Sequence, residues 1–249
     1  MFQALRSFLS GPSGAESGVF PTAIHAAAES HTGKVRTENE DVVYLHVDGP
    51  THSACAFALV ADGMGGSQGG KRASEVAART IAQMFGNGNG SPANALRKAF
   101  EAASKEIYRE ALRDKSLEGM GTTCVALAVR DSSAWAAWVG DSRLYLIRDK
   151  RMFQMTEDHS VVQQMVRDGL LTSAEASEHD ERNVLTRALG SKKTVAVSVW
   201  DEPFPVRPGD RFLLCSDGLH DVVPEDDILN IASNPGVELS CAALVDAAN

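Results

Sequence analysis

The residues best placed to do chemistry are two aspartates, Asp62 and Asp217, each followed by glycine and preceded by a short apolar run. The runs, 57–61 and 212–215, are typical of buried strands, and glycine lets the backbone turn tightly or approach a ligand. A single Asp-Gly pair is usually only a turn. Two such pairs, with Asn39-Glu40-Asp41 upstream, favour a metal centre built from carboxylates, and hard oxygen ligands suit Mg²⁺ or Mn²⁺.

The first of these corners can also supply a backbone ligand. The carbonyl of Gly63 follows the Asp62 carboxylate in the chain, and both kinds of oxygen bind hard cations. With Asp217, this set predicts a two-metal site, in which ions about 3.5–4 Å apart generate hydroxide near neutral pH and promote in-line displacement at phosphorus. Glu40 or Asp41 would orient metal-bound water, and Arg36, just before them in the chain, is placed for a bidentate contact with the remaining phosphate oxygens.

The acidic composition limits the classes of function. The 249 residues include 33 Asp and Glu against 24 Lys and Arg, which gives a formal net charge of −9. Nucleic acid is disfavoured as a partner because no basic excess would neutralise its phosphates. No apolar stretch is long enough for a signal peptide or a membrane span, so no membrane association is expected. The four cysteines, Cys55, Cys124, Cys215 and Cys241, are widely spaced, which predicts reduced thiols in a cytoplasmic protein.

The glycine-rich stretch after Asp62 fits two other catalytic motifs incompletely. Residues 65–71 match a phosphate-binding P-loop up to the position that should be Ser or Thr, which is Arg72. Residues 65–69 match the Gly-x-Ser-x-Gly elbow of α/β-hydrolases, but Ser67 stands too far from the apolar run for the required sharp turn. An NTPase and a serine hydrolase therefore stay as minor alternatives. A close approach of the backbone to a metal ion or a phosphate accounts better for the glycines.

Hydrophobic periodicity and turn signals predict alternating blocks of strands and helices. We expect strands at 24–30, 42–47 and 55–61, helices at 69–85 and 93–113, strands at 122–130, 134–139, 144–148 and 152–155, a helix at 158–168, strands at 195–200 and 211–216, and helices beginning near Pro224 and Leu239. The polar stretch 172–182 is expected to form a surface flap. Runs of hairpin strands with paired helices favour an antiparallel α+β layered domain over a parallel βαβ fold.

The chain is expected to contain one folded domain after a leader. Residues 10–20 are rich in Gly and Ser, so we expect residues 1–21 to form a flexible leader. Residues 22–249 show no internal repeat and no composition shift that would mark a domain boundary.

Six short motifs, in chain order, resemble the metal-dependent serine/threonine protein phosphatases of type 2C. They are Arg36-Thr-Glu-Asn39-Glu40-Asp41, Val60-Ala-Asp62-Gly63-Met-Gly-Gly66, Gly119-Met-Gly-Thr-Thr123, Gly140-Asp141-Ser-Arg143, Thr156-Glu-Asp-His-Ser160 and Ser216-Asp217-Gly-Leu-His-Asp221. Each motif is weak alone, but six in sequence are specific. The resemblance implies a four-layer α-β-β-α sandwich of two antiparallel sheets flanked by helices. It also implies hydrolysis of phosphoserine and phosphothreonine in proteins by a water that two metal ions activate.

The resemblance further implies a role for each matching residue. Asp62 would bridge the two ions, the Gly63 carbonyl would bind one of them and Asp217 the other. Glu40 and Asp41 would hold metal-bound waters, and Arg36 would bind the phosphate. As in some members of the family, Asp141 and Asp221 would join Asp217 around a third ion. A turn aspartate that accepts from backbone amides explains Asp141 and Asp221 equally well. We assign Thr122, Thr123 and Arg143 to packing or turns, and His159 and His220 to caps or core hydrogen bonds.

The sequence departs from the family pattern at two places. Met64 stands where some members have a histidine that acts as a general acid, so the leaving group would be protonated by water or another residue. The sequence also lacks the Asp-Asn-Ile/Val-Thr strand that carries another metal aspartate in the family. We therefore expect the ion at Asp217 to be held less well than the ion at Asp62.

These observations predict a bacterial-like, cytoplasmic type 2C phosphatase that uses Mn²⁺ or Mg²⁺ and opposes a serine/threonine kinase. Its expected partners are phosphoserine and phosphothreonine proteins, including a kinase or the substrates of a kinase. The missing aspartate leaves a second class open, a phosphoprotein-binding pseudophosphatase with a weakened metal site. Retention of every other acidic ligand disfavours that class, because a pure binding module gains little from carboxylates that repel one another.

Overall fold

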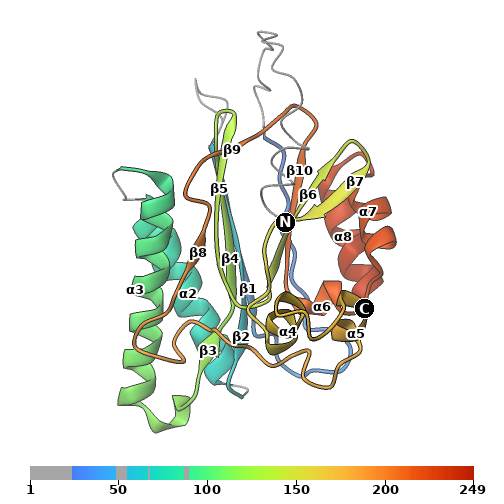
Figure 1. Ribbon diagram of the computed structural model, residues 1–249. Coiled ribbons are helices and arrows are strands. Elements are labelled where there is room, and N and C mark those ends of the chain that lie inside the picture. The colour runs from blue at the N-terminus through green and yellow to red at the C-terminus, as the bar shows by residue number, and fades with distance from the viewer. Residues whose placement is uncertain (1–23, 49–54, 67, 87–89) are drawn as a thin grey trace.

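Two antiparallel sheets lie face to face in the computed structural model, and helices cover the outer face of each sheet (Figure 1). The structure describes residues 24–48, 55–66, 68–86 and 90–249. The predicted leader and Ser67 therefore lie outside the described residues.

The helices and strands follow one another in the order of the predicted blocks. They are β1 (Asp41–Val47), β2 (Cys55–Met64), α2 (Gly69–Gly86), α3 (Pro92–Arg113), the short 3₁₀ helix η1 (Lys115–Leu117), β3 (Gly121–Thr122), β4 (Cys124–Arg130), β5 (Ser133–Val139), β6 (Arg143–Arg148), β7 (Arg151–Gln154), α4 (Val161–Arg167), α5 (Ser173–Ser177), β8 (Ser198–Val199), β9 (Phe204–Pro205), β10 (Arg211–Cys215), α6 (Asp217–His220), α7 (Glu225–Ala232) and α8 (Val237–Ala248).

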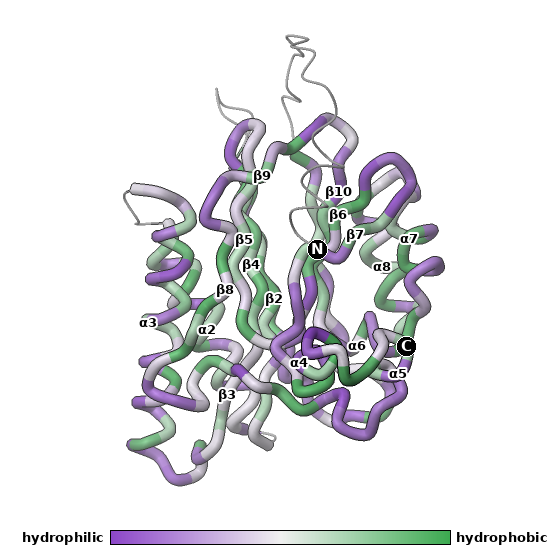
Figure 2. The backbone as a smooth tube through the Cα atoms, in the orientation of Figure 1, coloured by the Kyte–Doolittle hydropathy of each residue, from purple (hydrophilic) through white to green (hydrophobic). Residues whose placement is uncertain are grey.

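The larger sheet packs on both of its faces. Its strand order is β1-β2-β4-β5-β8, with β3 beside β2 and β9 beside β5. In β2, Leu59 joins a core with Ile81 of α2 and Phe100 of α3, whereas the next residue, Val60, joins a second core with Leu146 of β6. This alternation follows from the two-residue period of a strand. Because both faces are covered, β2 and β4 are mostly hydrophobic along their length (Figure 2).

The smaller sheet has the order β10-β6-β7 and separates the second core from a third. Leu146 of β6 faces the larger sheet, while Ile147 packs with Ile228 of α7 and Leu244 of α8. The layers are therefore helices, sheet, sheet and helices, which confirms the predicted α-β-β-α sandwich. No helix in the described ranges is long and apolar enough to cross a membrane.

Several element predictions were wrong in detail. Segment 24–30 was expected to be a strand but has no regular secondary structure, because its alanines lack the branched bulk that favours strands. The strand expected at 195–200 is reduced to β8. The helix expected at 158–168 begins at Val161, because Ser160 caps it by accepting from the Gln163 N–H at 3.2 Å.

Three further features were not predicted in full. The short strand β9 was missed, and a helix, α6, begins where only a turn was expected. The expected flap contains the helix α5, which begins with a capping box between Thr172 and Glu175.

Candidate active site

The two aspartate corners meet at one end of the sandwich. Asp41 is the first residue of β1 and lies directly opposite Asp62 of β2 in the register of the two strands. Asp217 is the first residue of α6, which follows β10 of the smaller sheet, and α6 lies near the same end of the larger sheet (Figure 1). The Asp62 carboxyl lies close enough to Asp41 and Asp217 for their charges to act on its pKa. Acidic groups from both sheets are thus brought together.

The acidic cluster is electrostatically unfavourable in the protein alone. Burial, followed by the charges of Asp41 and Asp217, raises the pKa of Asp62 to about 9. Burial also raises the pKa of Asp41, and burial together with Asp217 raises that of Asp141 to about 6. Carboxylates held this close need either protons or a cation to neutralise them.

Glu40 adds an acidic group with one unpaired oxygen. Its Oε1 atom is buried and has no hydrogen-bond partner within the described part of the chain, while Oε2 lies 3.8 Å from an Arg36 guanidinium nitrogen. The backbone beside it is well fixed, because the Glu40 carbonyl accepts from the Ser74 hydroxyl at 2.6 Å and from the Gly63 N–H at 3.2 Å. An orphaned carboxylate oxygen on a fixed backbone is a free ligand or water-binding group.

Two glycines allow helix α2 to begin directly against the first corner. A Cβ atom at Gly63 would lie 2.1 Å from the Gly70 carbonyl oxygen, and a Cβ atom at Gly70 would lie 2.6 Å from Glu40 Oε1. The glycines were predicted to bring the backbone close to a metal ion or a phosphate. The contacts show that these two bring α2 close to β2 and to the Glu40 carboxylate.

The donor set fits a hard divalent cation. In the ranges that the structure describes, no three His, Cys, Asp or Glu side chains form a complete set around one point. Mg²⁺ and Mn²⁺ do not need such a set, because they bind few carboxylates and keep several waters. Asp62, Asp217 and the Gly63 carbonyl provide oxygen donors only, and the orphaned Glu40 oxygen can hold a coordinated water.

Thr122 and Thr123 fix the backbone of the central aspartate. The Thr122 hydroxyl donates to the Asp62 carbonyl at 2.7 Å, and the Asp62 N–H donates to the Thr123 hydroxyl at 3.2 Å. The assignment of these threonines to packing or turns was therefore incomplete. Their polar side chains are oriented toward the corner, which the motif alone did not reveal.

Asp141 and Asp221 are in different situations. Asp141 lies between β5 and β6 and interacts electrostatically with Asp217, the largest cause of its raised pKa after burial. Asp221 follows α6, and its Oδ1 atom lies 3.0 Å from His220 Nδ1. This close contact with His220 lowers the pKa of Asp221. The structure therefore brings Asp141 toward the acidic cluster, whereas Asp221 is engaged by its neighbour.

His159 is part of the core, as predicted. Its Nδ1 atom accepts from the Gly140 N–H at 3.0 Å, and its Nε2 atom lies 2.9 Å from the Ser198 hydroxyl. Burial lowers the pKa of His159 to about 4, so the imidazole is neutral near pH 7. Arg143 is likewise structural, because it forms a bidentate ion pair with Asp158.

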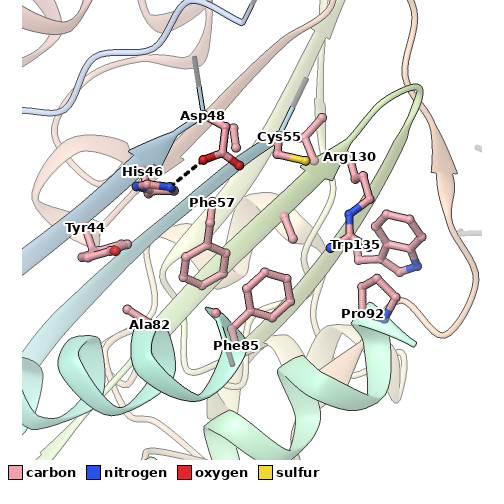
Figure 3. A pocket seen from close by; sticks show the side chains of 14 residues that line it. Tyr44, His46, Asp48, Cys55, Phe57, Ala82, Phe85, Pro92, Arg130 and Trp135 are labelled. Atoms are coloured by element: carbon pink, nitrogen blue, oxygen red, sulfur yellow. Dashed lines mark hydrogen bonds and ion pairs between the residues drawn. The ribbon is translucent and has the colours of Figure 1, made fainter. Parts of the chain in front are cut away.

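A cavity of about 260 Å³ lies at the other end of the larger sheet (Figure 3). Its wall includes the stacked rings of Phe57 and Phe85, with centroids 4.6 Å apart, and its polar edge includes His46, which lies 3.0 Å from Asp48. Along β1, the lining residue nearest to the acidic corner is Tyr44, which lies roughly 10 Å from Asp41 at the usual rise of a strand. None of the predicted site residues lines the cavity, so the predicted chemistry does not belong to it.

The sandwich and its acidic corner define a metal-dependent phosphoester hydrolase. The sequence profile of the family described as Protein phosphatase 2C matches residues 34–238. The chain therefore belongs to the protein phosphatase 2C family, and it is a metal-dependent serine/threonine protein phosphatase.

Relatives in sequence and in structure agree with this membership. The chain is 37% identical over 215 residues to the serine/threonine phosphatase Stp of Listeria monocytogenes, covering 84% of this chain and 82% of Stp. The crystal structure of PstP from Mycobacterium tuberculosis superposes with a TM-score of 0.78 at 35% identity, covering 89% of this chain and 90% of that chain. A structure of the PstP catalytic domain with two manganese ions gives a TM-score of 0.75 at 34% identity, with the same coverage.

Proposed function

We propose that the acidic corner hydrolyses phosphoserine and phosphothreonine in proteins with two divalent ions, Mn²⁺ or Mg²⁺. Asp62, Asp217 and the Gly63 carbonyl would hold the ions. The observation that carries this proposal is the position of the half-buried Asp62 carboxyl, which lies opposite Asp41 in the larger sheet and interacts electrostatically with Asp217, which follows the smaller sheet. The two manganese ions in the PstP structure support the same number of ions here.

Each remaining site residue has a task that its position permits. Bound divalent ions would make water acidic and neutralise phosphate oxygens. Glu40 and Asp41 would orient the attacking water, and Arg36, whose side chain is 65% exposed, would bind the phosphate of an incoming protein. Asp141 is the better candidate to support a third ion. The thioether of Met64 carries no acidic proton, so the leaving alkoxide would be protonated by water or another residue.

The proposed substrates are folded or flexible phosphoproteins that bind at an exposed surface. The acidic corner lies at the end of the sandwich and outside the cavity of Figure 3, which suits a phosphorylated segment of a second protein. Reversal of a serine/threonine kinase is the matching biological role. A cytoplasmic location is supported by the four free cysteines, since reduced thiols are usual in that compartment.

Release of phosphate from a phosphothreonine peptide tests the proposed function. Wild-type protein should release phosphate with added Mn²⁺ and stop when chelator is in excess, and Asp62→Asn should abolish turnover by loosening the ions. Ser67→Ala should turn over normally. Full activity in chelator, or loss of activity in Ser67→Ala with metal still bound, would contradict the metal mechanism. Peptide binding without phosphate release would instead identify a pseudophosphatase.

A further inference from the structure

Ser216 makes a hydrogen bond that joins the two sheets at the acidic corner. Its hydroxyl donates to Asp41 Oδ2 at 2.7 Å, across 175 positions of sequence. Ser216 lies between β10 and α6, while Asp41 begins β1. The serine is only 8% exposed, so water competes little for this bond. A charge-assisted hydrogen bond of this length is among the stronger kinds in proteins.

The Ser216 hydroxyl does not serve the usual purpose of a serine at its position. Ser216 occupies the N-cap of α6 with extended backbone angles, yet its side chain forms no capping hydrogen bond. By contrast, Ser160 and Thr172 cap α4 and α5 through their side-chain oxygens. Serine is favoured at an N-cap because its oxygen accepts from the first turn. Within the part of the chain that the structure describes, the Ser216 side chain makes one hydrogen bond, and it is directed to the acidic corner.

Asp41 would be less well oriented without this bond. A carboxylate that accepts hydrogen bonds at one oxygen is fixed in rotation, and its other oxygen then has a defined direction. Glu40 is supported at its backbone instead, because the Ser74 hydroxyl donates to the Glu40 carbonyl. Each acidic residue of the pair is thus held by a serine from another element.

We infer that Ser216 is a positioning residue that orients the Asp41 carboxylate toward the water it would hold on the metal ions. The inference rests on the proposed function of the same site. Ser216 is not among the residues proposed to hold the ions, the water or the phosphate, and it acts through Asp41. Residues that orient the groups around a metal typically change metal affinity or activity by about 10–100-fold when they are replaced.

Direct Mn²⁺ binding to the purified protein, measured by calorimetry, tests the inference without relying on activity. Ser216→Ala should raise the Kd for Mn²⁺ by about tenfold or more, and kcat at saturating Mn²⁺ should fall, while KM for a phosphopeptide stays within about twofold of wild type. Ser216→Thr keeps the hydroxyl and should approach wild-type affinity, whereas Ser216→Val, which has the same shape as threonine, should resemble Ser216→Ala. Ser240→Ala is the control, because Ser240 is similarly buried at 6% exposure and bonds to Asn234.

A double-mutant cycle separates an effect through Asp41 from an effect on the adjacent Asp217. In an Asp41→Asn background, Ser216→Ala should cause little further loss of Mn²⁺ affinity. Equal Mn²⁺ affinity in Ser216→Ala, Ser240→Ala and wild type would overturn the inference, and so would fully additive losses in the cycle. A wild-type protein that binds Mn²⁺ but releases no phosphate would contradict the proposed function alone, since the binding measurements would still report on Ser216.

Discussion

At Asp62, the requirements of folding and of function conflict. The folded protein buries this carboxyl beside two others and raises its pKa from 3.8 to about 9. Because the pKa of Asp62 is raised in the folded state, this group does not lower the free energy of unfolding at low pH, where it is protonated in both the folded and the unfolded state. Stability is lost as the pH rises toward the folded-state pKa, because only the unfolded state then ionises freely. Bound cations would offset this loss of stability, because they neutralise the carboxylates.

Removing the Asp62 charge should therefore stabilise the metal-free protein. In excess chelator, we expect wild-type Tm to fall between pH 5 and pH 8. At pH 8, Asp62→Asn should be more stable than wild type by about 2 kcal/mol, or roughly 4–8 °C in Tm. Added Mn²⁺ should raise Tm for wild type but not for the variant.

Thermal melts with and without chelator check this, with the exposed Asp180→Asn as control. A metal-free Asp62→Asn that melts below wild type at pH 8 would show that the ionised cluster is not destabilising.

The principal acidic residues could be predicted from sequence because each lies in a local pattern. Asp62 and Asp217 each follow a short apolar run and precede glycine, a pattern that marks where a buried strand can present a ligand. The strand predicted to end at Ala61 in fact continues to Met64, so Asp62 lies inside β2. Ser74 and Ser216 could not be predicted as supporting residues, because their partners Glu40 and Asp41 are distant in sequence. Nothing in a single sequence tells which buried hydroxyl bonds to which acidic residue.

Helix α2 connects the corner to the core. Its hydrophobic face packs on the larger sheet through residues such as Ile81, and its first turn lies against Gly63 and Glu40. The same helix thus contributes to stability along its length and to the site at its N-terminus. The two contributions can be separated by substituting glycines at its two ends.

Gly70→Ala should be destabilising although alanine favours helix formation. Its Cβ atom would lie 2.6 Å from Glu40 Oε1, so the helix or the carboxylate must move, at a cost of about 1–3 kcal/mol. Weaker Mn²⁺ binding should accompany the loss. Gly86→Ala, at the other end of α2, has nothing within 4 Å of its added Cβ and should be neutral or slightly stabilising. Denaturant unfolding of both variants makes the comparison. Equal stability of the two would mean that α2 can shift without affecting the corner.

Elements with strong periodicity were predicted well, and short irregular ones were not. The helices α2 and α3 match the expected ranges within a residue or two, since an amphipathic pattern repeats over several turns. Strands β8 and β9 contain only two residues each. Such strands exist because β5 offers backbone partners, which is a property of the folded sheet rather than of their own sequence.

At the scale of the whole molecule, the site depends on how the two sheets are held together. Asp41 and Asp62 come from the larger sheet, and Asp217 follows the smaller one, so any sliding between sheets would separate the ligands. Apolar packing between the sheets resists separation but has little directional preference. Polar contacts that cross the sandwich can supply direction. One is the Ser216 bond at the acidic end, and another lies at the far end of β6.

Arg148 ties the sheets at that far end. Its guanidinium forms a bidentate pair with Asp210, before β10, at 2.6 and 2.5 Å, and donates to the Pro205 carbonyl of β9 at 3.1 Å. It also lies 5.4 Å from the ring centre of Phe204. The side chains of Arg148 and Asp210 are 4% and 2% exposed, so the ion pair is removed from water. Its contribution to stability therefore depends strongly on its geometry.

Arg148→Ala should lower the free energy of unfolding by about 3–5 kcal/mol, because it leaves a buried aspartate without its cation. Arg109→Ala breaks an exposed pair with Glu106, whose side chains are 61% and 38% exposed, and should cost less than about 1 kcal/mol. Urea unfolding measures both. Replacing the whole pair, as in Arg148→Met with Asp210→Leu, should recover much of the loss, since no buried charge remains.

Below their melting temperatures, all three variants should need the same Mn²⁺ concentration for half-maximal activity, because Arg148 lies at the opposite end of β6 from Asp141. A loss in Arg148→Ala no greater than in Arg109→Ala would mean that packing alone fixes the two sheets, and a raised Mn²⁺ requirement would mean that the acidic corner responds to sheet alignment along its whole length.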